Sequence, residues 1–354
     1  MATLVQAVRL ALHYGETHLG VTDIFGEDVG PPLGGVFTAT QGLKTAWNTP
    51  LDERGIVGMA MGIAYGGGKP VAEIQFCDYA FNTIDLLKVA GNQRWAGAGN
   101  FTLPMVVMTP SGAGIRGSLY HSHSFESWAS RLAGWKVVMP SNPLDAYGLM
   151  LSAIEDPNPV MVLLPKALLR VKGTKEQRLP GEPEDGEELS RRIDAPVGDR
   201  SQWVPDWPAL KPHFVPIGSA SLVRRGDLAT VLAYGRMLPL CVQVADELAA
   251  EAGLHFDVID LRSIFPYDWA MISASLKHTG RLLIVNEDTE VTNFGEHLLR
   301  RAIDDHFYEL LAKPVLLMGK HVPGIGLNQH YELATVPQVA AVREAMRDLA
   351  MTTV

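Results

Sequence analysis

Residues 51–63, which read L-D-E-R-G-I-V-G-M-A-M-G-I, are the stretch that decides the fold. Glu53 is followed after four residues by Gly58 and then by Gly62, so one carboxylate stands in register with glycines at helical spacing. Together with Gly66 they share one face of the predicted helix. Glycine lowers helix stability, so this stripe indicates close approach by another backbone, as at a subunit interface. The alternative is an ordinary interior helix after a turn.

Length and composition outline the kind of protein. The chain has 354 residues, nearly half of them apolar, which predicts about two domains. Its net charge of −9 and the lack of a basic run argue against a nucleic-acid partner. Cys77 and Cys241 lie far apart, which favours a reducing compartment. No stretch approaches the ~20 apolar residues of a membrane span, and residues 1–15 have amphipathic rather than signal-peptide spacing. We expect a cytoplasmic protein without a membrane partner.

The order of elements predicts two α/β domains joined by a different kind of segment. In residues 1–170, buried strands alternate with helices, which favours a parallel sheet. Residues 171–213 are charged and rich in Pro and Gly, as in a linker or insertion, although Trp203 and Trp207 should pack onto something. Residues 214–354 again alternate strands with helices. The predicted strands are 21–25, 70–76, 104–108, 135–139, 160–164, 228–234, 256–260, 282–286 and 315–318, and the predicted helices are 3–14 (N-cap Thr3), 80–91, 143–154 (N-cap Ser141 or Asn142), 237–252, 293–306 and 336–350.

Polar residues at the ends of predicted strands are candidates for a site, because open α/β sheets bind ligands there. Glu27 and Asp28 follow the first strand, although they could simply cap a loop. Gln75 and Tyr79 follow the second, where an aromatic ring and an amide can hold a flat heterocycle, although Tyr79 alone could be core. The pair of histidines in L-Y-H-S-H-S (119–124) favours a proton donor over a metal site, because no third ligand is near.

Several motifs in order carry a resemblance to a known family. They are G-E-D-V (26–29), G-G-V-F (34–37), T-P-L-D-E-R-G-I-V-G-M-A-M-G (49–62), E-I-Q-F-C-D-Y (73–79), L-Y-H-S-H-S, I-E-D-P-N-P (154–159) and D-L-R-S-I-F-P-Y-D (260–268). The chain resembles the beta subunit of the thiamine-dependent decarboxylating component of 2-oxo acid dehydrogenase complexes, over nearly everything except 171–213. The motifs at 73–79 and 119–122 resemble the branched-chain type more than the pyruvate type. The implied fold is a pyrimidine-binding domain followed by a transketolase C-terminal-like domain.

The resemblance implies roles for individual residues. Glu53 would hydrogen-bond the N1′ nitrogen of the thiamine diphosphate aminopyrimidine ring. Leu51, Gln75 and Tyr79 would line the pocket of that ring, where Glu27 is a further candidate cofactor-binding residue. His121 would stand at the active-site mouth and assist acyl transfer to a lipoyl group. A structural potassium site is also implied, with ligands from Leu103, Val106, Ala153, Asp156 and Asn158, although Asp156 by itself reads as a turn after a helix.

An absent motif indicates the assembly. Thiamine enzymes usually hold magnesium and the diphosphate with G-D-G followed by N-N, and no such pair occurs in the sequence. The resemblance therefore implies an alpha subunit that holds magnesium, an α2β2 heterotetramer with beta-beta contact, and docking to a lipoyl-bearing transacylase core. The implied activity is oxidative decarboxylation of a small 2-oxo acid such as 2-oxoisovalerate. Pyruvate dehydrogenase, acetoin dehydrogenase and a non-catalytic scaffold subunit remain alternatives.

The sequence departs from the family pattern at four places. Residues 42–48 are about six residues shorter than usual, so the strand that leads to Glu53 should be truncated. His123 stands where the family usually has Gln, which puts two histidines at the predicted mouth. The stretch K-H-V-P-G-I-G (320–326), in the domain expected to dock the transacylase, lacks the usual acid and second proline. The segment 171–213 has no family counterpart, and we expect it to cover a surface.

Overall fold

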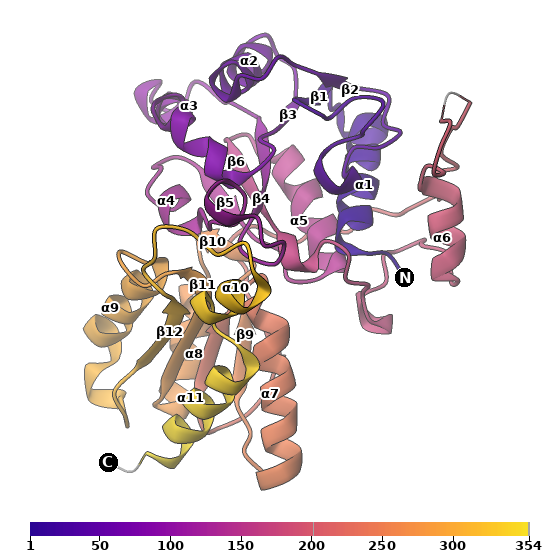
Figure 1. Cartoon of the computed structure of the whole chain (residues 1–354). Coiled ribbons are helices and arrows are strands. Elements are labelled where there is room, and N and C mark those ends of the chain that lie inside the picture. The colour runs from indigo at the N-terminus through magenta and orange to yellow at the C-terminus, as the bar shows by residue number, and fades with distance from the viewer. Residues whose placement is uncertain (201, 353–354) are drawn as a thin grey trace.

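The computed structural model describes residues 1–200 and 202–352. Ser201, inside the predicted insertion, and residues 353–354, at the end of the predicted second domain, lie outside the described residues. Figure 1 shows the first half of the chain as the upper α/β domain and the second half as the lower one. Each half is built on its own sheet.

The first sheet has seven strands in the order β10-β5-β6-β4-β3-β1-β2. Strands β1 to β6 are parallel, and the apolar runs of all of them except the edge strand β2 are buried. The strand β10 comes from the second half of the chain and pairs antiparallel with β5, which the sequence did not predict. The bounds are β1 Asp23–Gly26, β2 Ala46–Asn48, β3 Pro70–Glu73, β4 Val106–Ser111, β5 Lys136–Val138, β6 Val160–Pro165 and β10 Ser263–Phe265.

Capping explains where the helices around this sheet begin. Thr3 is the N-cap of α1, as predicted, and it also forms a capping box with Gln6. Of the two N-cap candidates before α5, Asn142 is the cap, because its side chain accepts from the Asp145 backbone. The helix expected at 80–91 starts later, because a 3-10 helix occupies Cys77–Thr83. The helices are α1 Leu4–Tyr14, α2 Glu53–Tyr65, α3 Ile84–Ala96, α4 Glu126–Ala129 and α5 Pro143–Glu155.

The second sheet has five strands in the order β12-β11-β8-β9-β7, with only β7 antiparallel to its neighbour. Helices α8 and α10 were not predicted, and the helix expected at 336–350 is α11, which begins three residues later than predicted. The strands are β7 Ser221–Arg224, β8 Thr230–Ala233, β9 Asp257–Asp260, β11 Leu282–Thr289 and β12 Val315–Gly319, and the helices are α7 Met237–Ala252, α8 Trp269–Thr279, α9 Phe294–His306, α10 Gln329–Thr335 and α11 Val339–Met351.

The segment between the two halves is folded against the first one. It contains the helix α6 (Gly186–Ile193), which buries Leu189 and Ile193 in the core cluster that also contains α1. Trp207 stacks on His13 of α1 with ring centroids 4.1 Å apart. The surface covered by this segment is therefore that of α1, and the expected packing of the tryptophans is observed for Trp207.

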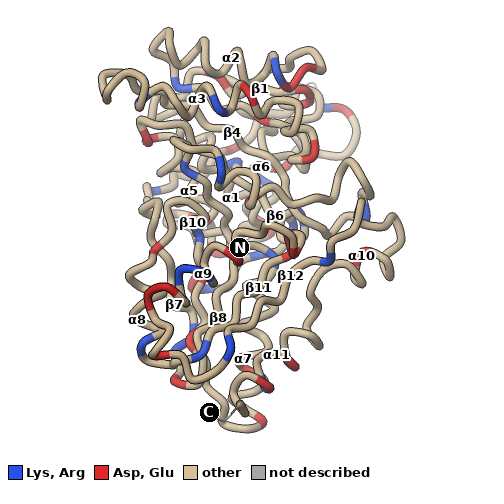
Figure 2. Tube along the Cα trace, turned by 90° about the vertical axis from the view of Figure 1, so that its left-hand side faces the viewer, with Lys and Arg blue, Asp and Glu red and all other residues tan. Residues whose placement is uncertain are grey.

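Neither a surface of one charge sign nor a membrane-spanning helix is found among the described residues. Figure 2 shows basic and acidic residues interspersed along the trace rather than gathered by sign. Among the described helices, none combines the length and apolar composition needed to cross a membrane.

Candidate active site

The predicted cofactor-binding residues meet at one edge of the first sheet. Strands β1, β3 and β4 are parallel neighbours, so their carboxyl ends point the same way. Glu27 follows β1, Gln75 follows β3, and the loop that carries His121 follows β4. Glu53 is the first residue of α2, which begins just after the three-residue strand β2 at the other side of β1.

Two carboxyl groups form the centre of the site. Glu53 is only 7% exposed, and its Oε2 accepts a hydrogen bond of 2.9 Å from the Asn82 amide. Burial and the neighbouring charge of Glu53 raise the pKa of Glu27 to about 7. The Oε1 atom of Glu27 is buried and accepts no hydrogen bond from the described residues. The pair can therefore hold a shared proton near neutral pH, with one oxygen left for a donor from outside this chain.

The side chains of Tyr79 and His121 form a hydrogen-bonded pair near the two carboxyl groups. The Tyr79 hydroxyl lies 2.8 Å from His121 Nε2, and His121 Nδ1 lies 3.2 Å from the Gly117 carbonyl. Because that carbonyl can only accept, a neutral His121 donates from Nδ1 and accepts from Tyr79. Burial, and then the charges of Asp78, Glu27 and Glu53, raise the pKa of the Tyr79 hydroxyl. Tyr79 therefore lies close enough to the carboxyl pair to feel its charge.

Gln75 and Leu51, the other two residues predicted to line the ring pocket, differ in their surroundings. The Gln75 amide donates to Asp28 Oδ2 over 2.5 Å, which fixes the amide orientation. Leu51 is 81% exposed, an unusual state for a leucine next to a buried carboxylate. An apolar partner from outside the chain would cover it.

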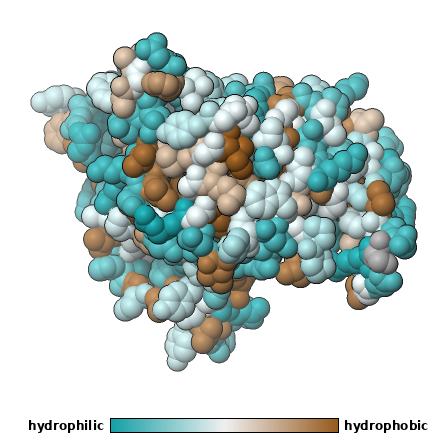
Figure 3. Space-filling view, turned by 90° about the horizontal axis from the view of Figure 1, so that it is seen from above, coloured by the Kyte–Doolittle hydropathy of each residue, from teal (hydrophilic) through white to brown (hydrophobic). Residues whose placement is uncertain are grey.

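The glycine stripe of α2 faces open space. A Cβ added at Gly62 would meet no atom within 4 Å, and one at Gly58 would meet only Leu86 Cδ1 at 4.0 Å. The close backbone approach expected from the sequence is therefore not made by the described part of this chain. Apolar patches are visible on the face seen from above (Figure 3), where α2 and α3 lie in Figure 1.

His123 does not join His121 at the predicted mouth. Its Nδ1 lies 2.8 Å from Asp78 Oδ1, and this bond raises the pKa of His123. Burial alone would raise the pKa of Asp78, but the bond to His123 keeps it below its ordinary value. The His123 ring lines a separate cavity of about 270 Å³ with Glu287 and Asp288. The two histidines of H-S-H thus serve different environments.

Three further residues near the site were not predicted from the sequence. Asn82 binds Glu53 from the 3-10 helix Cys77–Thr83, and nothing in its spacing indicates this. The Phe76 ring packs edge-on against His121 at 4.5 Å. Lys166 is 4% exposed, and its ammonium group lies 5.6 Å from the centre of the Phe76 ring. A lysine directly after the buried strand β6 was the available signal for it.

The predicted potassium ligands lie together but fit a cation poorly. Asp156 forms an ion pair with Lys136, and its Oδ1 accepts from both nitrogens of Asn158 at 2.9 Å. The carbonyl of Leu103 accepts from Met105, that of Ala153 accepts from Asp156, and Val106 begins β4. Because Lys136 already neutralises Asp156, this set has no free negative charge for potassium. No group of three or more His, Cys, Asp or Glu side chains suited to a metal occurs within 1–200 and 202–352.

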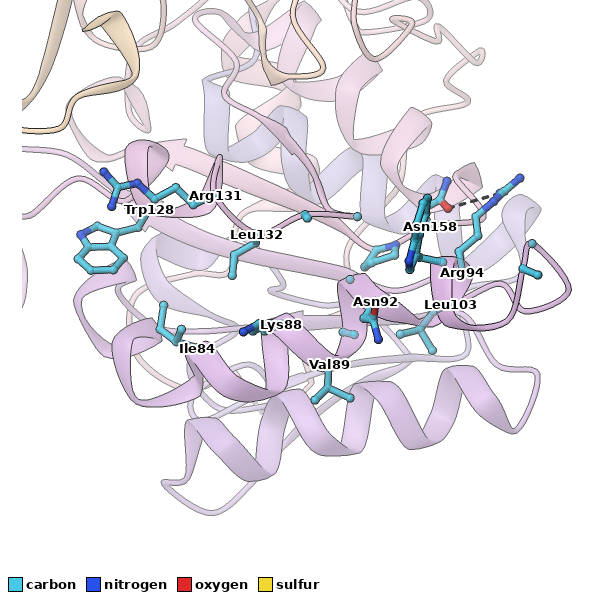
Figure 4. Close-up of a pocket in the computed structure, with 18 residues that line it drawn as sticks. Ile84, Lys88, Val89, Asn92, Arg94, Leu103, Trp128, Arg131, Leu132 and Asn158 are labelled. Atoms are coloured by element: carbon cyan, nitrogen blue, oxygen red, sulfur yellow. Dashed lines mark hydrogen bonds between the residues drawn. The ribbon is translucent and has the colours of Figure 1, made fainter. Parts of the chain in front are cut away.

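A large apolar groove lies between α3 and residues 128–134 (Figure 4). Its volume of about 1420 Å³ exceeds the roughly 300–1,000 Å³ typical of small-molecule pockets. Trp95, 87% exposed, and Trp128 contribute to its walls. None of the predicted catalytic residues lines it, so it is a surface feature separate from the carboxyl pair.

Comparisons with known proteins identify both domains and the family. Residues 11–172 match the family described as transketolase, pyrimidine binding domain, and residues 218–342 match transketolase, C-terminal domain. The chain is 38% identical to the 2-oxoisovalerate dehydrogenase subunit beta of Pseudomonas aeruginosa, over 88% of this chain and 85% of that protein. It is 33% identical to the pyruvate dehydrogenase E1 component subunit beta of Acholeplasma laidlawii, over 96% of both.

A solved structure shares the fold. It is a split gene transketolase described as an inactive beta4 tetramer, with a TM-score of 0.70, 16% identity and 99% coverage of both chains. At this identity the likeness concerns the fold alone. The relatives at 33% and 38% identity carry the family assignment: this chain belongs to the beta-subunit family of 2-oxo acid dehydrogenases, built from a transketolase-type pyrimidine-binding domain and a C-terminal domain.

Proposed function

We propose that this chain is the beta subunit of a thiamine-diphosphate-dependent 2-oxo acid dehydrogenase that acts on branched-chain substrates such as 2-oxoisovalerate. The observation that carries the proposal is the pairing of the buried Glu53 with the half-buried Glu27, whose pKa is raised to about 7. The 38% identity to a 2-oxoisovalerate dehydrogenase subunit beta supports the branched-chain choice. The pyruvate dehydrogenase relative makes pyruvate the second substrate to test.

The residues present fit the aminopyrimidine end of thiamine diphosphate. The unpartnered Oε1 of Glu27 and the exposed Leu51 are the kind of polar and apolar groups that a bound ring would cover. When bound, the cofactor supplies the electron sink for loss of carbon dioxide. Glu53 would hold a proton against the ring nitrogen, with Asn82 fixing its carboxylate and Glu27 sharing the proton. Gln75 and Tyr79 would complete the wall of the pocket.

His121 would act on the substrate side of the site. Its Nδ1 proton is directed to Gly117, and its Nε2 accepts from Tyr79. Tyr79 therefore orients the ring, while Phe76 supports it from the edge. With Nε2 as an acceptor, His121 would take up a proton through the Tyr79 hydroxyl during acyl transfer to a lipoyl group.

The other half of the site would come from an alpha subunit. The sequence lacks the G-D-G and N-N motifs, so magnesium and the diphosphate would be held by that partner. The open glycine face of α2 supports its placement there, because only a second chain could approach Gly58 and Gly62 closely. We propose an α2β2 heterotetramer with beta-beta contact, which would dock a lipoyl-bearing transacylase.

The test is decarboxylation by the assembled protein. The chain is co-expressed with its candidate alpha partner and assayed with thiamine diphosphate, magnesium, an artificial electron acceptor and either 2-oxoisovalerate or pyruvate. We expect turnover of 2-oxoisovalerate that falls by several orders of magnitude in Glu53→Gln. The matched control is Glu184→Gln, because the Glu184 side chain is 96% exposed. Undiminished activity in Glu53→Gln would refute the mechanism, and an assembled but inactive parent would indicate a scaffold subunit.

A further inference from the structure

Two departures from the family pattern meet in space. Gly42, at the start of the shortened stretch 42–48, has its backbone against the segment 171–213. A Cβ added at Gly42 would lie 2.7 Å from Pro205 Cγ and 3.0 Å from Trp203 Cη2. The same segment donates from the Ala195 backbone to Gln41 Oε1 at 3.1 Å. It therefore packs on the loop of residues 27–43, which carries Glu27, as well as on α1.

Arg9 of α1 joins this segment to the same loop. Its side chain is fully buried and forms an ion pair of 2.9 Å with Asp194 of the segment. The guanidinium also donates to the Ile193 carbonyl at 2.7 Å, to the Thr38 carbonyl at 2.8 Å and to Thr38 Oγ1 at 2.9 Å. The planar fork of arginine allows these bonds at once, and lysine could not replace it.

The part of the loop that Arg9 holds has an unfavourable backbone conformation. Phe37 and Thr38 have φ angles of +59° and +72°, in the left-handed region that residues with a Cβ avoid. Two consecutive residues of this kind persist only when their surroundings enforce the conformation. The bonds from Arg9 to Thr38 supply that constraint.

The strained residues lead directly to the candidate active site. The ring of Phe37 packs edge-on against Phe76 with centroids 6.4 Å apart, and Phe76 packs against His121 at 4.5 Å. Earlier in the loop, the Gly35 backbone donates to the Asp28 carbonyl at 2.6 Å. A change in the conformation at Phe37 and Thr38 would therefore remove one support of the Phe76 ring and loosen the Asp28 turn.

We propose that Arg9, anchored by Asp194, is a positioning residue: it holds Phe37 and Thr38 in their left-handed conformation and thereby keeps Phe37 and Phe76 in place behind His121. The segment 171–213 then stabilises the active-site loop where the stretch 42–48 is short. The conformational part of this proposal stands on the contacts alone, and its catalytic part rests on the proposed function.

Hydrogen exchange of the full chain tests the conformational part. Backbone amides of Gly34, Gly35, Thr38 and Thr40 are hydrogen-bonded within the loop, so their exchange reports its opening. We expect Arg9→Gln to accelerate exchange in 30–43 at least tenfold, with a smaller increase in 74–79. Trp203→Ala should act in the same direction from the Gly42 side, and it keeps the test valid if Arg9→Gln does not fold. Trp207→Ala is the control, because Trp207 stacks on α1 and leaves the loop contacts intact.

Turnover of the assembled enzyme tests the catalytic part. We expect Arg9→Gln and Trp203→Ala to lower kcat about tenfold while KM for the 2-oxo acid changes less than twofold, and Trp207→Ala to leave both unchanged. The positioning role is overturned if exchange in 30–43 stays within twofold of the parent in both test variants, or if Trp207→Ala accelerates it equally. A loosened loop with unchanged kcat would overturn the catalytic part. If the parent complex is inactive, the proposed function fails while the exchange measurement still decides the positioning role.

Discussion

The carboxyl group of Glu27 lies beside that of Glu53, and burial together with this charge raises the pKa of Glu27 to about 7. The two groups come from different elements, the end of β1 and the start of α2, so the fold brings like charges together. Two carboxyl groups brought together in this way are a recurring device for holding a proton at neutral pH.

The first prediction concerns the pH dependence of stability. In the unfolded chain the pKa of Glu27 returns to about 4.5, so the unfolded chain releases this proton at a lower pH than the folded chain does. Between about pH 4.5 and 7 this group therefore lowers the free energy of unfolding as the pH rises. Glu27→Gln removes that titration. The free energy of unfolding of the variant, relative to that of the parent, should therefore increase from pH 5 to 7.5. Urea unfolding at several pH values measures the difference, and parallel curves for the two proteins would contradict the pairing.

The second prediction concerns the donor to Glu53. Asn82→Leu removes the 2.9 Å hydrogen bond and leaves a buried carboxylate oxygen without its partner. We expect a loss of about 1–3 kcal/mol in the free energy of unfolding and a lower affinity for thiamine diphosphate in the assembled enzyme. Asn100→Leu, at an exposed position, is the control. Equal stability losses in both variants would show that the bond to Glu53 is not the cause.

The third prediction distinguishes glycines that face open space from those that face this chain. Gly62→Ala should raise the stability of the isolated chain by up to about 1 kcal/mol, because alanine is the better helix former and its Cβ meets nothing. Gly91→Ala should destabilise it, because the new Cβ would lie 2.3 Å from the Ala133 carbonyl oxygen.

The same glycine contrast also tests the proposed interface. Gly62→Leu should leave the isolated chain folded but abolish co-purification with the alpha partner. Thermal unfolding and pull-down separate the two effects. A Gly62→Leu chain that still assembles normally would place the alpha subunit elsewhere.

Local signals in the sequence were sufficient for the elements that build the site. The capping box at Thr3, the cap at Asn142 and the apolar runs of β4 and β6 involve near neighbours or uniform burial. The strands that end at the site could therefore be predicted, and with them the neighbourhood of Glu27, Gln75 and His121.

Elements that depend on distant partners could not be predicted. The strand β10 has three residues and exists because it pairs with β5, more than 100 positions earlier. Helix α6 lies in a charged stretch, and only Leu189 and Ile193 are buried, in the core shared with α1. The separate environments of His121 and His123 follow from the position of Asp78, which spacing alone does not give.

The fourth prediction concerns potassium. Because Lys136 is paired with Asp156, exchanging potassium for sodium at constant ionic strength should leave the melting temperature unchanged. Lys136→Met leaves Asp156, which is 9% exposed, without its cation and should lower the free energy of unfolding by about 1–3 kcal/mol. In that variant alone, potassium should restore part of the loss, since Asp156 Oδ2 has then lost its ion pair and can bind a hard cation. Lys88→Met, on α3, controls for the loss of a lysine. A parent protein that is itself stabilised by potassium over sodium would show that the ion pair opens to admit the ion.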